Sequence, residues 1–372
     1  MNEETMKQFG ATIQRLINKE DLTEEETYSM FKEVLNNEQP DLQQGAFLAA
    51  LASKGETIEE IVGTWRAIVE FDTVPVHLDS EGPLVENCGT GMDSLKTFNV
   101  STAAAIVASA CGATMVRHGA RALTSFCGTV DMAEALGVDV ECDVYTVLAS
   151  IKSQGIGLFN GMSPNIHPGG LGRILSQIRF GSTLNIAASL ANPARPSHGV
   201  RGVYSEDLLE PVGATMSAIG YSRSLVVHGK AEGLDGGMDE FSVCGESLVH
   251  EVDADGHTNT YTLRPEELGL KTVPFADIAT TGDLKRERTR FLDVLSGRNH
   301  ESCIAFTCMN AGAALYVAGL TDSIESGVTQ SRQAIESGAA TEKLRNWVAT
   351  QNRQPVQGLA KLNAATRAKA RT

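Results

Sequence analysis

The sequence predicts an α/β protein in two parts: a small all-helical domain at about residues 1–75 and a large domain at about 76–340 built on a central, mostly parallel sheet. The first part shows helical periodicity only, whereas from Leu84 onward short apolar runs alternate with helical patterns. Such alternation is typical of parallel strands joined by helices. At 372 residues, the chain is long enough for two domains and a large core.

The helical part is predicted from one apolar face and two helix-start signals. The face consists of Met6, Phe9, Ile13, Leu16 and Ile17. The stretches TEEE, which begins at Thr23, and TIEE, which begins at Thr57, match a capping box, in which the Thr caps the helix and the Glu reaches back. Helices are therefore expected at about 23–35, 41–54 and 57–69, with a segment crossing between the domains at 71–83.

In the large domain, the apolar runs predict buried strands at about 84–87, 113–116, 156–159 and 225–227. Helices are expected at about 101–109, 130–136, 208–219 and 305–317. In such a sheet, the groups that act on a ligand are expected in the loops beyond the carboxyl ends of the strands.

The composition argues against several classes of protein. A net charge of −15 argues against a nucleic-acid-binding surface. No apolar run approaches the roughly 20 residues of a membrane span, and the N-terminus MNEETMKQFG lacks the pattern of a signal peptide. The seven cysteines form no CxxC pair, so neither a disulfide framework nor a zinc site is indicated, and a cytoplasmic location is expected.

The charge is uneven, because residues 341–372 carry seven Lys or Arg and one acid. Helical periodicity is weak after Val348, and Pro355 follows. The segment is expected to be a basic, partly disordered tail, with a binding arm as the alternative.

The segment after the first strand, CGTGMDSLKTFNVST, has the composition of an anion-binding loop. Gly89 and Gly91 let the backbone approach a ligand closely with free N–H groups. Asn99 and Ser101 stand at the expected start of a helix, where the helix dipole favours phosphate. Asp93 suits ribose hydroxyls or a hydrated metal. A lone GxG is a weak signal that usually marks an ordinary turn.

Two further pieces point to the same ligand. Arg117 and His118 follow directly from the next strand, and the hydroxyl of Thr129 comes shortly after. Far downstream, the adjacent acids Asp239 and Glu240 end a glycine-rich stretch and suit magnesium. A lone Asp-Glu pair usually lies on a solvated face. Together with the loop, the pair predicts a site for a phosphorylated sugar and its metal.

These motifs resemble those of anthranilate phosphoribosyltransferases. That family carries a GTGGD loop, an N-[IV]-S-T helix start and a KHGNR…SS…GSAD segment; this sequence reads GTGMD, NVST and RHGAR…TS…GTVD. Further matches, such as SPNIHP, LANPA and NAGAALYVAGL, occur in family order over roughly residues 5–348. The resemblance implies the nucleoside phosphorylase/phosphoribosyltransferase architecture, a homodimer formed through the helical domain, 5-phosphoribosyl diphosphate (PRPP) as donor, and Mg²⁺ as cofactor.

The resemblance implies a role for each matching residue. Donor contacts are implied for Gly89, Thr90, Gly91, Asp93, Thr97, Asn99, Ser101, Thr102, Arg117, Ser125 and Thr129. Magnesium is assigned to Ser101, Asp239 and Glu240. Catalytic roles are assigned to Arg117 and Asp93, because a departing pyrophosphate needs metal ions and preorganised donors more than a covalent nucleophile.

The implied acceptor pocket departs from the family pattern. Its residues would be Gly89, His118, Ala120, His167 and Gln177. Ala120 replaces the Asn of KHGNR, and Gln177 stands where the family has an Arg that grips the anthranilate carboxylate. Arg173 and Arg179 lie close by and are candidates to replace that Arg. Losing both family groups would remove roughly 2–4 kcal/mol of recognition.

Two more features of the loops are unusual. Met92 takes the place of the last Gly of GTGGD, and several extra residues, KAEGLDGGM, precede Asp239. His118 and His167 fit either the wall of the pocket or ordinary packing. Cys88 and Cys127 are expected to pack rather than act as nucleophiles.

The sequence leaves several functions open. The default is transfer of phosphoribose to anthranilate in tryptophan biosynthesis, and the first alternative keeps the donor chemistry with a different aromatic amine or nitrogen heterocycle. Pyrimidine nucleoside phosphorylases share the architecture, but their Lys and Ser signature is not evident. A non-catalytic relative that binds nucleic acid or a protein is the remaining alternative, favoured by the basic tail and opposed by the acidic body.

Overall fold

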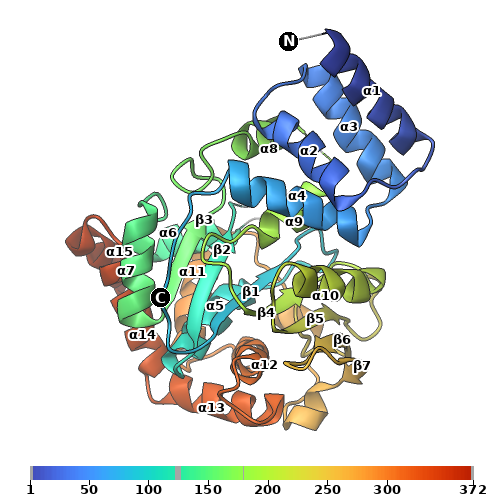
Figure 1. Ribbon diagram of the computed structural model, residues 1–372. Helices are drawn as coiled ribbons and strands as arrows, with labels where there is room; N and C mark the ends of the chain where they lie inside the picture. The colour runs from blue at the N-terminus through green and yellow to red at the C-terminus, as the bar shows by residue number, and fades with distance from the viewer. Residues whose placement is uncertain (1–2, 122–126, 179, 370–372) are drawn as a thin grey trace.

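The computed structural model describes residues 3–121, 127–178 and 180–369. Four helices open the chain: α1 (Glu3–Ile17), α2 (Glu24–Leu35), α3 (Asp41–Lys54) and α4 (Ile58–Phe71). Both predicted capping boxes are present, at Thr23 with Glu26 and at Thr57 with Glu60. The four helices stand together at one end of the molecule (Figure 1).

Two later helices complete this helical unit. They are α8 (Leu171–Gln177) and α9 (Leu184–Leu190), whose buried residues share one apolar cluster with those of α1–α4. Trp65 of α4 donates its indole N–H to the carbonyl of Leu190, 3.0 Å away. The helical unit therefore extends through α8 and α9 to the large domain.

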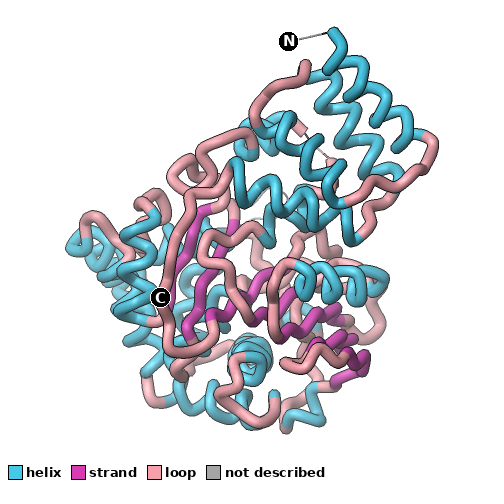
Figure 2. Tube along the Cα trace, in the orientation of Figure 1, coloured by secondary structure: helices cyan, strands magenta, loops and turns pink. Residues whose placement is uncertain are grey.

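A single seven-stranded sheet forms the centre of the large domain (Figure 2), in the order β3-β2-β1-β4-β5-β6-β7. The strands are β1 (Leu84–Gly89), β2 (Thr114–Gly119), β3 (Ile156–Asn160), β4 (His198–Gly202), β5 (Arg223–Gly229), β6 (Ser247–Val252) and β7 (Thr258–Leu263). The first five are parallel, and β6 and β7 are antiparallel. The prediction of a mostly parallel sheet is confirmed.

Helices bury both faces of the sheet, which is the usual state of parallel strands. In β5, Leu225 and Val227 point into one apolar cluster, whereas Val226 points into the cluster shared with the helical unit. The other helices are α5 (Val100–Ala110), α6 (Thr129–Leu136), α7 (Val144–Gln154), α10 (Leu209–Ala218), α11 (Leu284–Leu295), α12 (Glu301–Val317), α13 (Ile324–Glu336), α14 (Ala339–Thr350) and α15 (Pro355–Lys369).

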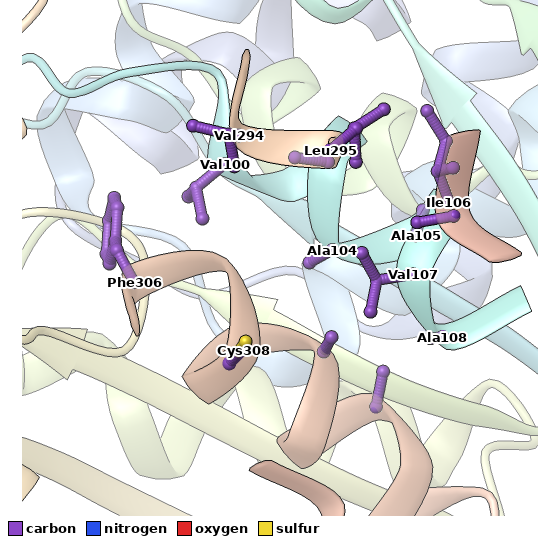
Figure 3. Packing of buried hydrophobic residues seen from close by; sticks show 14 of the residues in the cluster. Val100, Ala104, Ala105, Ile106, Val107, Ala108, Val294, Leu295, Phe306 and Cys308 are labelled. Atoms are coloured by element: carbon purple, nitrogen blue, oxygen red, sulfur yellow. The ribbon is translucent and has the colours of Figure 1, made fainter. Parts of the chain in front are cut away.

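Helix α5 is central to the larger cluster because it is apolar on all sides. Figure 3 shows Val100 of α5 next to Val294 of α11, and Ala104 and Val107 of α5 between Leu295 of α11 and the helix that carries Cys308. All of these residues belong to one buried cluster. The start of α5 carries Ser101, so a rigid core holds this hydroxyl in position.

The prediction of a partly disordered tail is wrong for residues 341–369, which form most of α14 and α15. Trp347 is fully buried and donates its indole N–H to Gln351 Oε1 at 2.8 Å. The Gln351 side chain also bonds the backbone N and O of Leu158 on the edge strand β3. The charge count missed this segment because its apolar residues dock on the rest of the domain, which composition alone does not report.

Among the described helices, none has both the length and the apolar character needed to cross a lipid bilayer.

Candidate active site

A cavity of about 630 Å³ lies at the carboxyl ends of β1, β2 and β3, between the sheet and helices α8 and α9. It is lined by the glycine loop after β1, the start of α5, the end of β2, Thr129, and the acids Asp239 and Glu240. Parallel strands place their ligand-binding loops at this edge. The structure thus brings together segments that are far apart in the sequence.

The glycine loop and the acidic pair are in direct contact. The backbone N–H of Gly91 donates to Asp239 Oδ2 at 2.7 Å. A Cβ atom on Gly89 would overlap the Asp239 carboxylate, so only glycine allows this approach. The N–H of Thr90 donates to the carbonyl of Gly202 at the end of β4, 2.9 Å away, which fixes the loop to the sheet.

The extra residues before Asp239 form a closed loop that braces this contact. Gly229 and Met238 exchange backbone hydrogen bonds of 2.9 and 2.8 Å, so the chain leaves the end of β5 and returns to it. Gly237 accepts from the N–H of Leu95 at 3.1 Å and donates to Ser94 Oγ at 3.0 Å. The insertion therefore positions the acids against the glycine loop.

Three carboxylates gather at this point. Asp93, Asp239 and Glu240 each offer an oxygen, and these oxygens lie within 4.8 Å of one another. Burial, reinforced by the charge of Asp93, raises the pKa of Asp239 to about 6. Burial and the charge of Asp239 raise the pKa of Glu240 well above its usual value. Oxygen ligands of this kind and number suit Mg²⁺, which keeps several waters and substrate oxygens.

Glu240 and Lys96 define the charge balance of the acid cluster. Glu240 Oε2 is buried and has no hydrogen-bond partner among the described residues. Lys96 Nζ lies 2.6 Å from Asp93 Oδ1. No sequence motif singled out Lys96, although a lysine three positions after a candidate acid in the same loop is a usable signal.

The start of α5 provides further polar groups. Ser101, Thr97 and Asn99 line the cavity. Asn99 is the N-cap residue, but its side chain makes no cap hydrogen bond, and its buried Oδ1 has no partner in the part of the chain that the structure describes. The N–H of Val100 donates to the carbonyl of Phe98 at 2.6 Å, so among the described residues the N–H of Ser101 is the first of α5 that remains available to an anion.

Arg117 of β2 is one of the residues that line the cavity. It is 1% exposed, and its guanidinium donates to Thr102 Oγ1 at 2.7 Å and to the carbonyl of Asn87 at 3.2 Å. Burial lowers the pKa of Arg117 to about 10. Thr102 is fully buried and is absent from the residues found to line the cavity, so it lies behind Arg117 rather than facing a ligand. A direct contact between Arg117 and a diphosphate would require these bonds to break.

The other half of the cavity is mainly apolar. His118 and Ala120 line it, together with apolar side chains from α8, α9 and the loop between them: Leu171, Leu175, Ile178, Phe180 and Leu184. Met92 is 46% exposed and has a φ of 67°, a left-handed conformation that favours glycine. Its side chain reaches Gly181, where a Cβ would come within 2.9 Å of Met92 Cε.

Two of the predicted acceptor residues, His167 and Gln177, do not line the cavity. Gln177 lies farther along the chain, in a different place. Together with Arg173 it lines a separate small depression beside Asp41 and Gln44, not the large cavity. Arg173 donates to Gln44 Oε1 at 3.0 Å and to the carbonyl of Val34 at 2.7 Å, so it is engaged by the helical unit. The neighbouring residues Leu175 and Ile178 line the large cavity instead. Ser125 and Arg179 lie outside the described residues.

His118 and His167 form a buried pair whose ring nitrogens Nε2 are 3.0 Å apart. His167 Nδ1 lies 2.6 Å from the carbonyl of Asp72, which can only accept, so this nitrogen carries a proton. Burial lowers the pKa of both rings, to about 3 for His118. In the neutral pair, His118 Nε2–H therefore donates to His167 Nε2. His118 faces the cavity, and His167 supports it from behind.

Other polar residues of the cavity were not anticipated. Arg121 pairs with Glu134 and Glu141, at 2.7 and 3.2 Å. Glu287 accepts two hydrogen bonds from Arg290, at 2.9 and 2.8 Å. Arg121 is the last residue of the RHGAR motif, although no role of its own was assigned to it. Glu287 gave no local sequence signal, because it reaches the cavity from a distant segment.

The site can be compared with known proteins. Residues 81–341 match the α/β domain of a glycosyl transferase family, and residues 11–71 match the helical bundle domain of that family. The chain is 35% identical over 339 residues to an anthranilate phosphoribosyltransferase of Chloroflexus aurantiacus, covering 91% of this chain and 97% of the relative. It is 37% identical over 340 residues to the enzyme of that name from Anaeromyxobacter sp. (strain K), with the same coverage.

Two solved structures are also similar. Anthranilate phosphoribosyltransferase from Thermus thermophilus superposes with a TM-score of 0.80 at 32% identity, covering 91% of this chain and 98% of that one. The enzyme of that name from Saccharomyces cerevisiae, in complex with PRPP and Mg, gives a TM-score of 0.81 at 24% identity, covering 94% and 98%. The latter similarity concerns the fold alone.

Proposed function

The chain is a member of the anthranilate phosphoribosyltransferase family, and we propose that it catalyses the magnesium-dependent transfer of a 5-phosphoribosyl group from PRPP to the nitrogen of a small aromatic acceptor. The observation that carries this proposal is the contact between Gly91 and Asp239. It joins the glycine loop to the acid pair, and this closeness supports a single site for a diphosphate and its metal.

In this reaction, the bond between C1 of the ribose and the diphosphate oxygen breaks, and its electron pair leaves with the diphosphate. The acceptor nitrogen forms a bond to C1 and loses a proton. Because charge develops on the leaving group, groups that are already oriented toward it lower the barrier most. The N–H groups of Met92 and Asp93 in the loop and of Ser101 at the start of α5, which donate to no other described residue, are assigned to the diphosphate. Thr97, Thr129 and the Ser101 hydroxyl also line the cavity.

Asp239, Glu240 and Asp93 would hold magnesium, with Ser101, which lines the same cavity, as a further oxygen. The metal, when bound, would neutralise charge on the diphosphate as it departs. Arg117 is assigned a supporting role: its buried charge lies beneath the loop, and its bonds to Thr102 and Asn87 keep the end of β1 and the start of α5 together.

Anthranilate, the acceptor named for the relatives, is the first candidate acceptor, and tryptophan biosynthesis would then be the pathway. A specific observation favours a second candidate. The cavity that His118 lines is also lined by Ala120, Leu175, Ile178 and Phe180. Arg173 is held away from it, and the charge of Arg121 is balanced by Glu134 and Glu141. An apolar wall of this kind favours an aromatic amine or nitrogen heterocycle that lacks a carboxylate.

The experiment is a pyrophosphate-release assay with PRPP, Mg²⁺ and either anthranilate or a panel of uncharged aromatic amines and heterocycles. Release that depends on both PRPP and one acceptor supports the proposal and identifies the acceptor. The rate of pyrophosphate release should be at least about 100-fold lower in Asp239→Asn than in the wild type. The control Asp235→Asn changes an exposed acid of the same loop and should keep the wild-type rate. No release with any acceptor, together with salt-sensitive nucleic-acid binding, would favour the non-catalytic alternative.

We also propose that the enzyme is a cytoplasmic homodimer formed through its helical unit. Leu42 is 89% exposed on α3, and Ile17 is exposed at the end of α1, so this unit presents apolar side chains for a partner. The cysteines are all unpaired, as suits a reducing compartment. Sedimentation analysis of the wild type and of Leu42→Glu tests the dimer: the variant should be monomeric.

A further inference from the structure

Lys96 stands in an unusual place for a lysine of an active-site loop. Its ammonium group lies 2.6 Å from Asp93 Oδ1, and that carboxylate belongs to the cluster of three whose oxygens lie within 4.8 Å of one another. The charge of Lys96 also acts on Asp239 and Glu240, where it opposes the mutual repulsion of the acids. A cation of the protein itself is thus part of the site proposed for the metal.

We propose that Lys96 is a built-in counter-cation, which balances the acid cluster until PRPP arrives and then moves to the diphosphate, leaving the carboxylates to the metal. This inference rests on the proposed function. Its consequence is that metal and PRPP bind together: magnesium alone competes with Lys96, and the donor removes the competitor.

The need for a counter-cation follows from the charges of the cluster. Three carboxylates converge, and two of them are largely buried, so their repulsion is poorly screened by water. Glu240 Oε2 has no hydrogen-bond partner among the residues that the structure describes. A buried acid oxygen without a partner is costly, and the ammonium group of Lys96 beside the cluster offsets part of that cost. A divalent ion offers a stronger offset, so the two cations compete for the same oxygens.

The backbone at Lys96 is fixed, which leaves its side chain as the moving part. The carbonyl of Lys96 accepts from the N–H of Thr280 at 3.0 Å, and Leu95 N–H donates to Gly237 at 3.1 Å. Thr97 forms an isolated bridge with Ala279. The Lys96 side chain is only about one-third exposed, but it lines the cavity on a flexible stem of four carbons. It can therefore turn from Asp93 toward a diphosphate bound by the same loop.

The test is Mn²⁺ binding to the full-length protein without PRPP, followed by electron paramagnetic resonance, in the wild type and in Lys96→Met. Methionine keeps most of the length of the side chain and removes its charge. The variant should bind Mn²⁺ about tenfold more tightly than the wild type, because its competitor is gone. With Mg²⁺ present, the variant should bind PRPP about tenfold more weakly, so the coupling between metal and donor shrinks.

Two further variants control the experiment. Lys96→Arg keeps the charge and should retain weak metal binding in the absence of PRPP. Lys271→Met removes an exposed lysine elsewhere and should match the wild type throughout. Equal or weaker Mn²⁺ binding by Lys96→Met overturns the inference.

The failure of this inference is distinguishable from a failure of the proposed function. If the wild type releases pyrophosphate but Lys96→Met binds Mn²⁺ no more tightly, the transferase stands and the counter-cation does not. If Lys96→Met gains metal affinity but no acceptor supports pyrophosphate release, Lys96 balances the cluster of a protein with another activity, and its assigned movement to PRPP is wrong.

Discussion

The N–H of Gly91 donates to the carboxylate of Asp239 at 2.7 Å, although 148 positions separate the two residues in the chain. The bond joins the loop after β1 to the loop after β5. Because the N–H fixes one oxygen, the carboxylate is held close to Asp93 and Glu240. The geometry of the candidate donor site depends on this contact.

Gly89→Ala should remove activity with little change of fold. The added Cβ would overlap the Asp239 carboxylate and push it from its place. A shift of about 1 Å in such a site costs on the order of 100-fold in rate, which pyrophosphate release would measure. Gly82→Ala is the matched control, because its Cβ would meet nothing within 4 Å. Equal rates for Gly89→Ala and the wild type would contradict the close approach.

The buried histidine pair should make stability depend on pH. Burial, with the neighbouring His167, lowers the pKa of His118 to about 3 in the folded protein, whereas an unfolded histidine takes up a proton near pH 6.5. The unfolded state therefore gains protons first as pH falls, and the free energy of unfolding decreases. Between pH 7 and pH 5, the titration of this group should lower the free energy of unfolding by about 2 kcal/mol.

Denaturant unfolding at the two pH values measures that loss. His118→Gln should show a smaller decrease than the wild type, since glutamine does not titrate. His77→Gln, at an exposed histidine, should keep the wild-type decrease. An unchanged decrease in His118→Gln would show that the pair does not carry the effect.

Met92→Gly should alter the choice of acceptor more than stability. Glycine adopts the left-handed backbone without strain, which raises the free energy of unfolding by about 1 kcal/mol. The greater freedom of glycine in the unfolded chain lowers it by about 0.5–1 kcal/mol, so the two effects nearly cancel. The cavity widens beside Gly181, and bulkier acceptors should gain in kcat/KM relative to small ones. Met92→Leu keeps a large side chain and should preserve the wild-type order. The same order in Met92→Gly would mean that Met92 does not limit the acceptor.

Trp347→Ala should destabilise the protein by about 3–5 kcal/mol, because a large side chain is lost from a fully buried position. It also removes the partner of Gln351, which bonds Leu158 of β3. Thermal and denaturant unfolding measure the change, with Glu342→Ala at an exposed position of the same helix as control. If Trp347→Ala unfolds like the wild type, α14 contributes nothing to the core.

Local sequence patterns were enough to predict much of the fold but not its long-range partners. The boxes at Thr23 and Thr57 are contained within single turns, so the sequence predicted them correctly. Strand β4 was missed because HGVRG has two glycines and a charged residue. That residue, Arg201, is buried beside Glu86 at 3.1 Å, a partner 115 positions away. Helices α14 and α15 were missed for the same reason, since their apolar faces are recognisable only once docked.

In the candidate site, too, local motifs predicted some residues correctly and tertiary contacts determined the others. Gly89, Asp93, Ser101 and Asp239 line one cavity, as the motifs indicated. Gln177 does not line that cavity. Each residue turns a helix by about 100°, so an error of two positions in matching the sequence to the family motif moves a side chain to another face. The burial of Arg117 and the place of Lys96 depend on tertiary contacts that no local pattern reports.

The proposed donor site is tested most directly by a crystal structure with PRPP and Mn²⁺, in which anomalous scattering locates the metal. We expect a Mn²⁺ peak at the carboxylates of Asp239 and Glu240, bound to a diphosphate that lies against the 89–93 loop and the start of α5. A metal peak remote from these two acids, or a PRPP diphosphate bound away from that loop, would contradict it.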